Sequence, residues 1–222
     1  MARKTKEEAQ ETRNGILDAA ERMFHEKGVS RTSLGDIAEA AGVTRGAIYW
    51  HFKDKVDLFD AMLERIVMPM EFMVGENEGA DSDPIARMRA SAVAVLIKTA
   101  TDPQAQRVFD IVCHKCEYVD DMAPLRARHV EGRDECLSQV EKGIREAVRK
   151  GALPRGTDAK RAAIGMHALI DGLISNWTLD PSYFPLARDA EKLIDTYIAG
   201  LRAAPAAKAA SPPRLRAVAR AR

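Results

Sequence analysis

The sequence lacks the features of a secreted or membrane-spanning protein. It contains only three cysteines among 222 residues, an odd number that gives no disulfide framework and favours a reducing compartment. Its N-terminus is charged and has no apolar segment of the kind that signal peptides carry. No apolar run approaches the roughly 18–20 residues that a transmembrane helix needs. We therefore expect a cytoplasmic protein with no membrane partner.

Aromatic and β-branched residues are also scarce. Aromatic residues make up 5% of the chain although hydrophobic residues make up 46%, and runs of β-branched residues are few. Ala, Leu, Glu, Arg and Met are abundant instead, and this mixture favours helices. Since no strand pattern of any length is present, we expect an all-α fold with a substantial core.

The charge balance gives no overall indication of nucleic-acid binding, because the formal net charge is only +1. Positive charge is nevertheless concentrated in residues 1–6, 43–55 and 204–222. Such local concentration matters more for DNA binding than the total. The last segment is rich in Ala, Pro and Arg without any acidic residue, so we expect a disordered basic tail that acts mainly as a linker.

Capping residues and apolar periodicity divide the chain into helices. We expect the first helix to begin with a capping box at Thr5 and to end at Gly28. Asp54 should cap a long helix that extends past Pro69, and this proline should kink the helix or end its straight part. Residues 75–84 have the composition of a loop. Apolar periodicity predicts further helices at about 84–100, 103–119, 122–150, 157–178 and 186–203.

The most informative feature is a pair of short predicted helices joined by a glycine turn. Ser33 caps the first helix, Gly42 ends it, and Thr44 caps the second. This is the layout of a helix-turn-helix, in which the second helix reads the major groove of DNA. Ile48 and Phe52 are expected in the core beneath it. The alternative is a helical hairpin inside a plain bundle.

The second helix of this motif carries side chains suited to a DNA groove. Arg45 has the reach for a bidentate pair with guanine, worth about 1–3 kcal/mol of discrimination. Gly46 permits close approach to the DNA backbone, whereas a plain bundle would bury Tyr49 and Trp50 in its core.

Two strings carry a resemblance to a known family: residues 2–12, and Gly42-Val-Thr-Arg-Gly-Ala-Ile-Tyr-Trp-His-Phe-Lys53. Residues 1–66 resemble the DNA-binding head of the TetR family of transcriptional repressors, especially the multidrug-efflux branch typified by AcrR and TtgR. Weaker similarity through 114–117 and 171–174 extends the match over nearly the whole chain except the tail.

The resemblance implies a ligand-responsive repressor whose homodimer binds a palindromic operator in double-stranded DNA. The operator would control a multidrug (RND-type) efflux operon, and a small hydrophobic inducer would release the repressor from the operator. The expected architecture is a three-helix head at 1–53, joined by a long helix to a larger domain at 54–203, with about nine helices before the tail at 204–222. The resemblance also implies DNA contacts, mainly with phosphates, from Thr32, Ser33, Trp50, His51 and Lys55, and with bases or phosphates from Thr44, Arg45, Gly46 and Tyr49.

One recognition helix gives too little contact for an operator, so helix-turn-helix proteins pair and read two half-sites. The resemblance places the dimer seam on the predicted helices 157–178 and 186–203. Their apolar residues are Ile164, Leu169, Ile170, Leu173, Trp177, Leu193, Ile194, Tyr197, Ile198 and Leu201.

The predicted middle helices carry polar groups inside apolar stripes. Asp110 and His114 lie four residues apart, as do His167 and Asp171. A largely apolar cavity with a few polar anchors is typical of a small-molecule site, whereas the alternative is a buried histidine–carboxylate pair that only satisfies itself. The expected ligand contacts are Ile66, Met88, Val95, Phe109, Asp110, Cys113, His114, Val140, His167, Ile170, Asp171 and Ile174.

A different class of function would use Cys113, His114 and Cys116 as a thiol or metal sensor. One C-x-x-C pair is a weak signal because a tetrahedral zinc site needs two further ligands. We favour core positions for these thiols, and also for Cys136. The chain has no phosphate loop, HExxH, nucleophile elbow or dinucleotide fingerprint, so we expect neither an enzyme nor a cofactor. A TetR-type regulator of other genes remains a further alternative.

Overall fold

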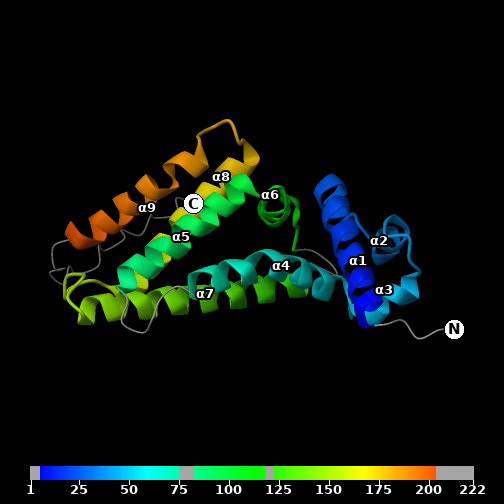
Figure 1. Cartoon of the computed structure of the whole chain (residues 1–222), viewed down its shortest axis with the longest axis horizontal. Helices are drawn as coiled ribbons and strands as arrows, with labels where there is room; N and C mark the ends of the chain where they lie inside the picture. Colours follow the sequence, from blue (N-terminus) through cyan, green and yellow to red (C-terminus); the bar gives the residue numbers. More distant parts are fainter. Residues whose placement is uncertain (1–5, 76–82, 119–122, 204–222) are drawn as a thin grey trace, which may run out of the picture.

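The computed structural model describes residues 6–75, 83–118 and 123–203. All regular elements in these ranges are helical, which confirms the all-α fold. None of these helices is long and apolar enough to cross a bilayer. Figure 1 shows a head at one end of an elongated body. The elements are α1 (Lys6–Lys27), α2 (Leu34–Ala40), α3 (Arg45–His51), α4 (Lys55–Gly75), α5 (Pro84–Thr101), α6 (Pro103–Asp110), the π turn η1 (Ile111–Lys115), α7 (Ala123–Arg149), α8 (Ala159–Leu179) and α9 (Leu186–Ala203).

The head consists of α1, α2 and α3, whose ends follow the local signals in the sequence. Gly28 and Gly42 adopt φ values of +84° and +67°, in the left-handed region that favours glycine. The Ser33 hydroxyl accepts a hydrogen bond from the Asp36 amide at 3.1 Å, and the Ser33 amide donates to the Asp36 carboxylate at 2.8 Å. Thr44 caps α3 through its side chain. The predicted caps at Ser33 and Thr44 and the predicted stops at Gly28 and Gly42 are therefore confirmed.

The core of the head continues into the body through α4. Ile48 and Phe52 are buried as expected. The rings of Phe24 on α1 and Phe59 on α4 lie 5.9 Å apart, so α4 forms one wall of the head. The same apolar cluster reaches Ile111 at the start of η1. The first half of α4 thus belongs to the packing of the head as much as to that of the body.

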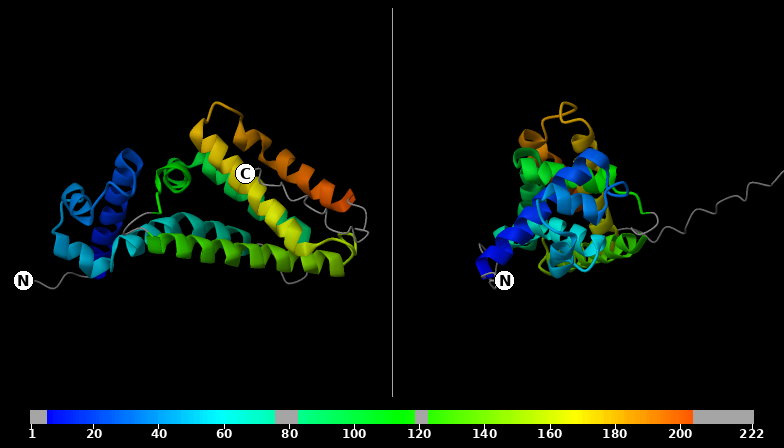
Figure 2. Two further views of the ribbon diagram at one scale, coloured as in Figure 1. Left: turned by 180° about the vertical axis from the view of Figure 1, so that it is seen from behind. Right: turned by 90° about the vertical axis from the view of Figure 1, so that its right-hand side faces the viewer.

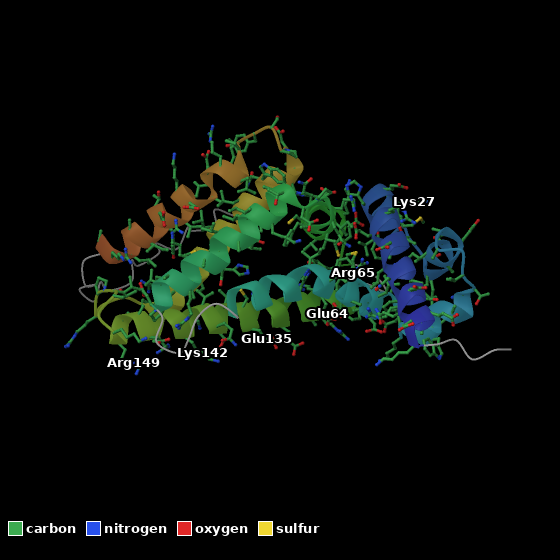
Figure 3. All side chains as sticks on the ribbon, in the orientation of Figure 1. Lys27, Glu64, Arg65, Glu135, Lys142 and Arg149 are labelled. Carbon is green, nitrogen blue, oxygen red and sulfur yellow. The ribbon has the colours of Figure 1, made fainter. Side chains whose placement is uncertain are left out.

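In the body, α5 packs against α9 and α7 against α8. Figure 2 shows α4 and α7 along one long side, with α5, α8 and α9 on the other. Glu135, Lys142 and Arg149 project from the outer side of α7 (Figure 3). Val95 and Phe109 contact both the apolar cluster of the head and that of the body, so the two cores are continuous.

One predicted element differs from the one observed. The helix expected over 103–119 ends at Asp110, is followed by the π turn η1, and leaves 116–118 outside any helix. The helix α4 passes through Pro69 and ends at Gly75, which confirms that it extends past the proline, since the loss of one backbone hydrogen bond does not end a helix that neighbouring turns support. The predicted cap at Thr5, most of the predicted loop over 75–84 and the tail lie outside the described residues.

The continuous core predicts a large difference between two aromatic substitutions. Phe59→Ala removes a fully buried ring and should lower the free energy of unfolding by about 3–5 kcal/mol. Trp50→Ala removes a ring that is 73% exposed and should change that free energy by less than about 0.5 kcal/mol. Urea unfolding followed by circular dichroism measures both, and equal losses would contradict the placement of these rings.

Candidate nucleic-acid interface and ligand site

The recognition helix α3 is fixed on one side and open on the other. Ile48 is fully buried and anchors the helix to the core of the head. The Thr44 hydroxyl accepts a hydrogen bond from the Ala47 amide at 3.2 Å, which satisfies a backbone donor in the first turn. Tyr49 and Trp50 are 49% and 73% exposed, respectively. Their exposure argues against the plain bundle, in which both would lie in the core.

The arginine of α3 is oriented by its neighbour one turn along. A guanidinium nitrogen of Arg45 donates to the Tyr49 hydroxyl at 3.2 Å, and the guanidinium carbon lies 5.7 Å from the centre of the tyrosine ring. Gly46 between them is exposed, and a Cβ there would meet only Thr44, at 3.9 Å. His51 is half-buried, with its ring edge-on to Trp50 at 4.6 Å between centres. The outer face of α3 is therefore an ordered aromatic and cationic surface.

The side chains of Thr32 and Lys55, two of the expected phosphate contacts, are buried and bonded to backbone carbonyls. The Thr32 hydroxyl donates to the Gly28 carbonyl at 2.8 Å, and only 1% of this residue is exposed. The Lys55 ammonium donates to the carbonyls of Val29 and Thr32, both at 3.2 Å. These bonds hold the turn between α1 and α2, because buried carbonyls need donors.

At the start of α2, Ser33 forms a capping box with Asp36. Its hydroxyl lies 2.7 Å from the Asp36 carboxylate as well as accepting from the Asp36 amide. The backbone and side-chain hydrogen bonds from Ser33 hold the pKa of Asp36 below its usual value. The Asp36 carboxylate therefore lies beside Ser33 at the N-terminus of α2.

A cleft of about 740 Å³ opens beside α3 and carries basic groups that the sequence reasoning did not select. Besides Arg45 and Tyr49, its lining includes Arg31 from the turn before α2, Lys53 after α3, and Arg128 from α7. Lys53 could have been selected because it lies in the basic segment around the motif. Arg31 belongs to no basic cluster in the sequence, so no sequence pattern pointed to it. Both side chains are exposed, so they extend the cationic surface around α3.

The histidine expected in the ligand site joins η1 to α8. The His114 Nε2 lies 3.0 Å from the Ser175 carbonyl and 3.1 Å from the Thr178 hydroxyl. The Thr178 hydroxyl donates its own proton to the Ile174 carbonyl at 2.8 Å, so Nε2 must be the donor to both partners. His114 is thus satisfied by a backbone carbonyl and a hydroxyl rather than by a carboxylate.

Asp110 does not face the predicted ligand site, which corrects its assignment. Its carboxylate lies 3.3 Å from the His25 Nε2 on α1 and 4.0 Å from the Lys115 ammonium. Asp110 is the last residue of α6, directly before the π turn. Asp110 therefore lies at the junction between head and body.

A polar group that sequence reasoning missed lies between η1, α7 and α8. The Tyr118 hydroxyl hydrogen-bonds to the His129 Nδ1, and the His129 ring lies edge-on to Phe59, 6.3 Å between centres. Burial lowers the pKa of His129 and raises that of Tyr118, so both are neutral near pH 7. Asp171, an expected ligand contact, is exposed on α8. Its charge raises the pKa of Tyr118 and Cys113 and opposes the lowering of the pKa of His129. Although both are described, His167 and Asp171 form no ion pair.

The apolar residues expected around a ligand lie in one region of the body. Val95 and Phe109 contact both apolar clusters, and Ile66 is buried in the cluster shared with the head. Ile174 is buried in the cluster of the body, while His167 is half-buried on α8. The remaining expected contacts pack against the cluster of the body: Met88, Cys113, Val140 and Ile170.

The outer face of α8 and the turn after it present apolar surface that no described part of the chain covers. Ile164, Leu179 and Tyr183 are 48%, 70% and 70% exposed. A groove of about 300 Å³ on α8 is lined mainly by apolar side chains, among them Leu169, Leu173, Tyr183 and Phe184. Three residues expected at the seam are instead buried within the subunit: Trp177, Ile194 and Ile198.

Comparison with known proteins identifies the family. The model for "Bacterial regulatory proteins, tetR family" matches residues 16–62, and the model for "MAATS-type transcriptional repressor, C-terminal region" matches residues 83–203. The chain belongs to the TetR family. It is 44% identical over 207 residues to the transcriptional regulator TtgR of Pseudomonas putida, covering 93% of this chain and 99% of TtgR.

Solved structures of TetR-family repressors share the fold. NalD, the secondary repressor of the MexAB-OprM multidrug efflux pump in Pseudomonas aeruginosa, is 34% identical with a TM-score of 0.80, covering 89% of this chain and 99% of NalD. The complex of SmeT with triclosan is 33% identical with a TM-score of 0.76, covering 86% and 91% of the two chains. SmeT is the repressor of the Stenotrophomonas maltophilia multidrug efflux pump SmeDEF.

The cysteines of this TetR-family chain occupy two kinds of site. Burial raises the pKa of the Cys113 and Cys116 thiols to about 11. Cys136 is exposed on α7, so its expected core position was wrong. The apolar periodicity of α7 misled because most of this part of the helix faces solvent. Within the described ranges, no three His, Cys, Asp or Glu side chains are grouped to hold a metal ion.

The thiol pKa values predict selective labelling. At pH 7.5 a thiol with a pKa of about 11 is thiolate in well under about 0.1% of molecules, and the thiolate is the reactive form. Iodoacetamide should therefore modify Cys136 first, with Cys113 and Cys116 reacting only at higher pH or after unfolding. Peptide mass spectrometry over time measures the order, and early labelling of Cys113 would contradict it.

Lys53 and Lys55 form a matched pair for testing the DNA surface of the head. Lys53→Met should weaken binding to all DNA sequences and reduce the salt slope of log K by about 1, because it removes one phosphate contact. Lys55→Met should instead lower the free energy of unfolding by about 1.5–3 kcal/mol, since carbonyls lose a charged donor. Salt-titrated DNA binding and urea unfolding of both variants measure this, and a reversal of the two effects would restore Lys55 as the phosphate contact.

Proposed function

We propose that the protein is a ligand-responsive transcriptional repressor of the cytoplasm. Two copies bind a palindromic operator that controls a multidrug efflux operon of the RND type, and a hydrophobic drug-like ligand releases them. The observation that carries the proposal is the outer face of α3, where Arg45, Tyr49 and Trp50 are presented to solvent while Ile48 holds the helix on the core. Similarity to regulators of efflux pumps supports the choice of target genes.

The DNA contacts of this proposal come from the surface around α3. Arg45 and Tyr49 read base edges at the N-terminal half of the helix, and Gly46 allows close approach. Trp50 and His51 meet phosphates, with Arg31 and Lys53 extending the contact along the backbone. Phosphate contacts set position and affinity, while base contacts set sequence preference.

A second copy of the chain is the partner that we propose for the outer face of α8. Tyr183 lines the groove on α8, Leu179 is the last residue of α8, and both are 70% exposed. Large apolar side chains that are grouped and exposed to this degree mark a protein–protein interface. Pairing through α8 and α9 buries them and sets two heads for two half-sites, which a twofold operator requires.

The inducer is proposed to bind in the body, where the apolar residues around Val95 and Phe109 meet the polar groups of η1 and α8. His114, Asp171 and the Tyr118–His129 pair supply polar anchors among apolar walls, the usual composition of a small-molecule site. The complex of a relative with triclosan, a chlorinated phenol, supports a ligand of this class. The ligand acts by preferring a conformation in which the heads no longer fit two half-sites.

The second candidate, a thiol or metal sensor, has less support. Cys113 and Cys116 are only partly exposed, and their thiol pKa values are raised to about 11, whereas redox-sensing thiols need lowered pKa values and access to solvent. A TetR-type regulator of other genes has the same DNA surface and differs only in its target.

Arg45 provides the decisive test of DNA reading. Arg45→Ala should weaken operator binding by about 1–3 kcal/mol and reduce the preference over unrelated DNA, because a bidentate base contact is lost. The control Arg145→Ala removes an exposed arginine that pairs with Glu141 on α7, and should leave affinity unchanged. Mobility shifts with the DNA upstream of the gene and with a scrambled duplex measure both, and wild-type binding that does not distinguish the duplexes would refute the proposal.

A further inference from the structure

A buried carboxylate ties the head to the body. Glu21 on α1 is 3% exposed. Its two oxygens accept hydrogen bonds from the Arg107 Nε at 2.7 Å and the Gln104 Nε2 at 2.9 Å, both on α6. A buried charge is costly unless it is paired and hydrogen-bonded, and losing one partner of such a pair is strongly destabilising. The position of α1 relative to α6 is therefore specified by Glu21.

Further contacts continue this junction along the chain. His25 of α1 meets Asp110 at the end of α6 at 3.3 Å. The Val29 amide, in the turn after α1, donates to the Lys115 carbonyl in η1 at 3.0 Å. The same turn is bound by the Lys55 ammonium, which sets the start of α2. The segment from α6 to η1 thus contacts the part of the head that positions the helix-turn-helix.

The other side of this segment is bound to α8. His114 in η1 donates to the Ser175 carbonyl and the Thr178 hydroxyl. Ser175 lies one helical turn after Asp171, on the side of α8 that faces the proposed ligand. One short segment therefore contacts α8 within the ligand-binding region and the C-terminal end of α1 in the head (Figure 1).

The π turn within this segment provides a route for movement. A π turn holds one more residue per turn than an α-helix, is rare, and occurs often at functional sites. If this turn converts to α geometry, the register of the residues beyond it changes by one residue. These residues then rotate by about 100° about the helix axis and move by about 1.5 Å along it. Such a change displaces Lys115 and with it the bond to Val29.

We propose that Glu21 is a positioning residue that couples the head to α6 and η1, so that a change at the ligand-facing side of α8 reaches the DNA-binding head through this segment. This inference rests on the proposed function for its biological meaning, but the coupling is a property of the chain itself. It adds a route beside the continuous core along α4. The removal of Glu21 leaves the DNA surface intact and breaks the transmission.

Hydrogen exchange at the Val29 amide tests the coupling without DNA or inducer. Thr178→Val on α8 removes one partner of His114 and should accelerate exchange at Val29 by about threefold or more, because local opening sets the rate. Thr196→Val is the matched control, since Thr196 on α9 bonds only within its own helix. Exchange at the Phe52 amide, which is bonded to the Ile48 carbonyl, should stay unchanged in both variants.

Glu21→Gln completes a double-mutant cycle. Alone it should accelerate Val29 exchange, and in its presence Thr178→Val should add little, because coupled sites are not additive. Glu26→Gln, an exposed carboxylate on the same helix, is the control. Unchanged Val29 exchange in Thr178→Val, or full additivity in the double variant, would overturn the coupling. If Glu21→Gln fails to fold, the result for Thr178→Val decides alone.

Operator release by triclosan separates this inference from the proposed function. Glu21→Gln should bind the operator yet need at least about tenfold more triclosan for release than the Glu26→Gln control, because a coupling of about 1.4 kcal/mol is lost. A wild-type protein that binds no operator refutes the proposed function and leaves the exchange result standing. Equal triclosan sensitivity of the two variants, with wild-type release intact, overturns the coupling role of Glu21.

Discussion

A seven-residue helix is not stable in water alone, because nucleation costs more than its few hydrogen bonds return. Both helices of the DNA-reading motif have this length, so each depends on tertiary support. Ile48 and Phe52 supply it for α3 by complete burial. The Lys55 ammonium supplies it for the turn before α2 by binding two carbonyls. The side chains that face DNA are thus positioned by residues on the opposite, buried side of the motif.

The packing that supports the motif does not stop at the head. Phe59 brings α4 into contact with Phe24, and Val95 and Phe109 contact the apolar clusters of both head and body. Close-packed interiors transmit strain because they have few voids to absorb it. A ligand that changes the packing around Phe109 therefore alters the support of α3. The hydrogen bonds to Glu21 connect the head and the body at defined atoms, in addition to this apolar packing.

Residues with similar appearance in the sequence have different positions in the structure. Lys53 and Lys55 are two residues apart in one basic segment, yet Lys53 is exposed and Lys55 is buried. Asp110 and Asp171 both lie within apolar stripes, but Asp110 is half-buried and pairs with His25 in the head, while Asp171 is exposed on α8 in the body. Periodicity assigns a residue to a helix and a face, but it does not tell which element that face meets, so these side chains were only partly predictable.

The sequence by itself determined the helical class, the caps at Ser33 and Thr44, the glycine stops at Gly28 and Gly42, and the recognition motif. These features depend on residues within about one helical turn of each other, so the local sequence contains their cause. Tertiary structure alone decided that Lys55 points inward and that Glu21 holds α6. The two partners of the bond from Lys55 to the Val29 carbonyl are 26 residues apart, and those of the bond from Arg107 to Glu21 are 86 residues apart. Contacts over such separations exist only after the helices have packed, because packing sets the distance between their ends.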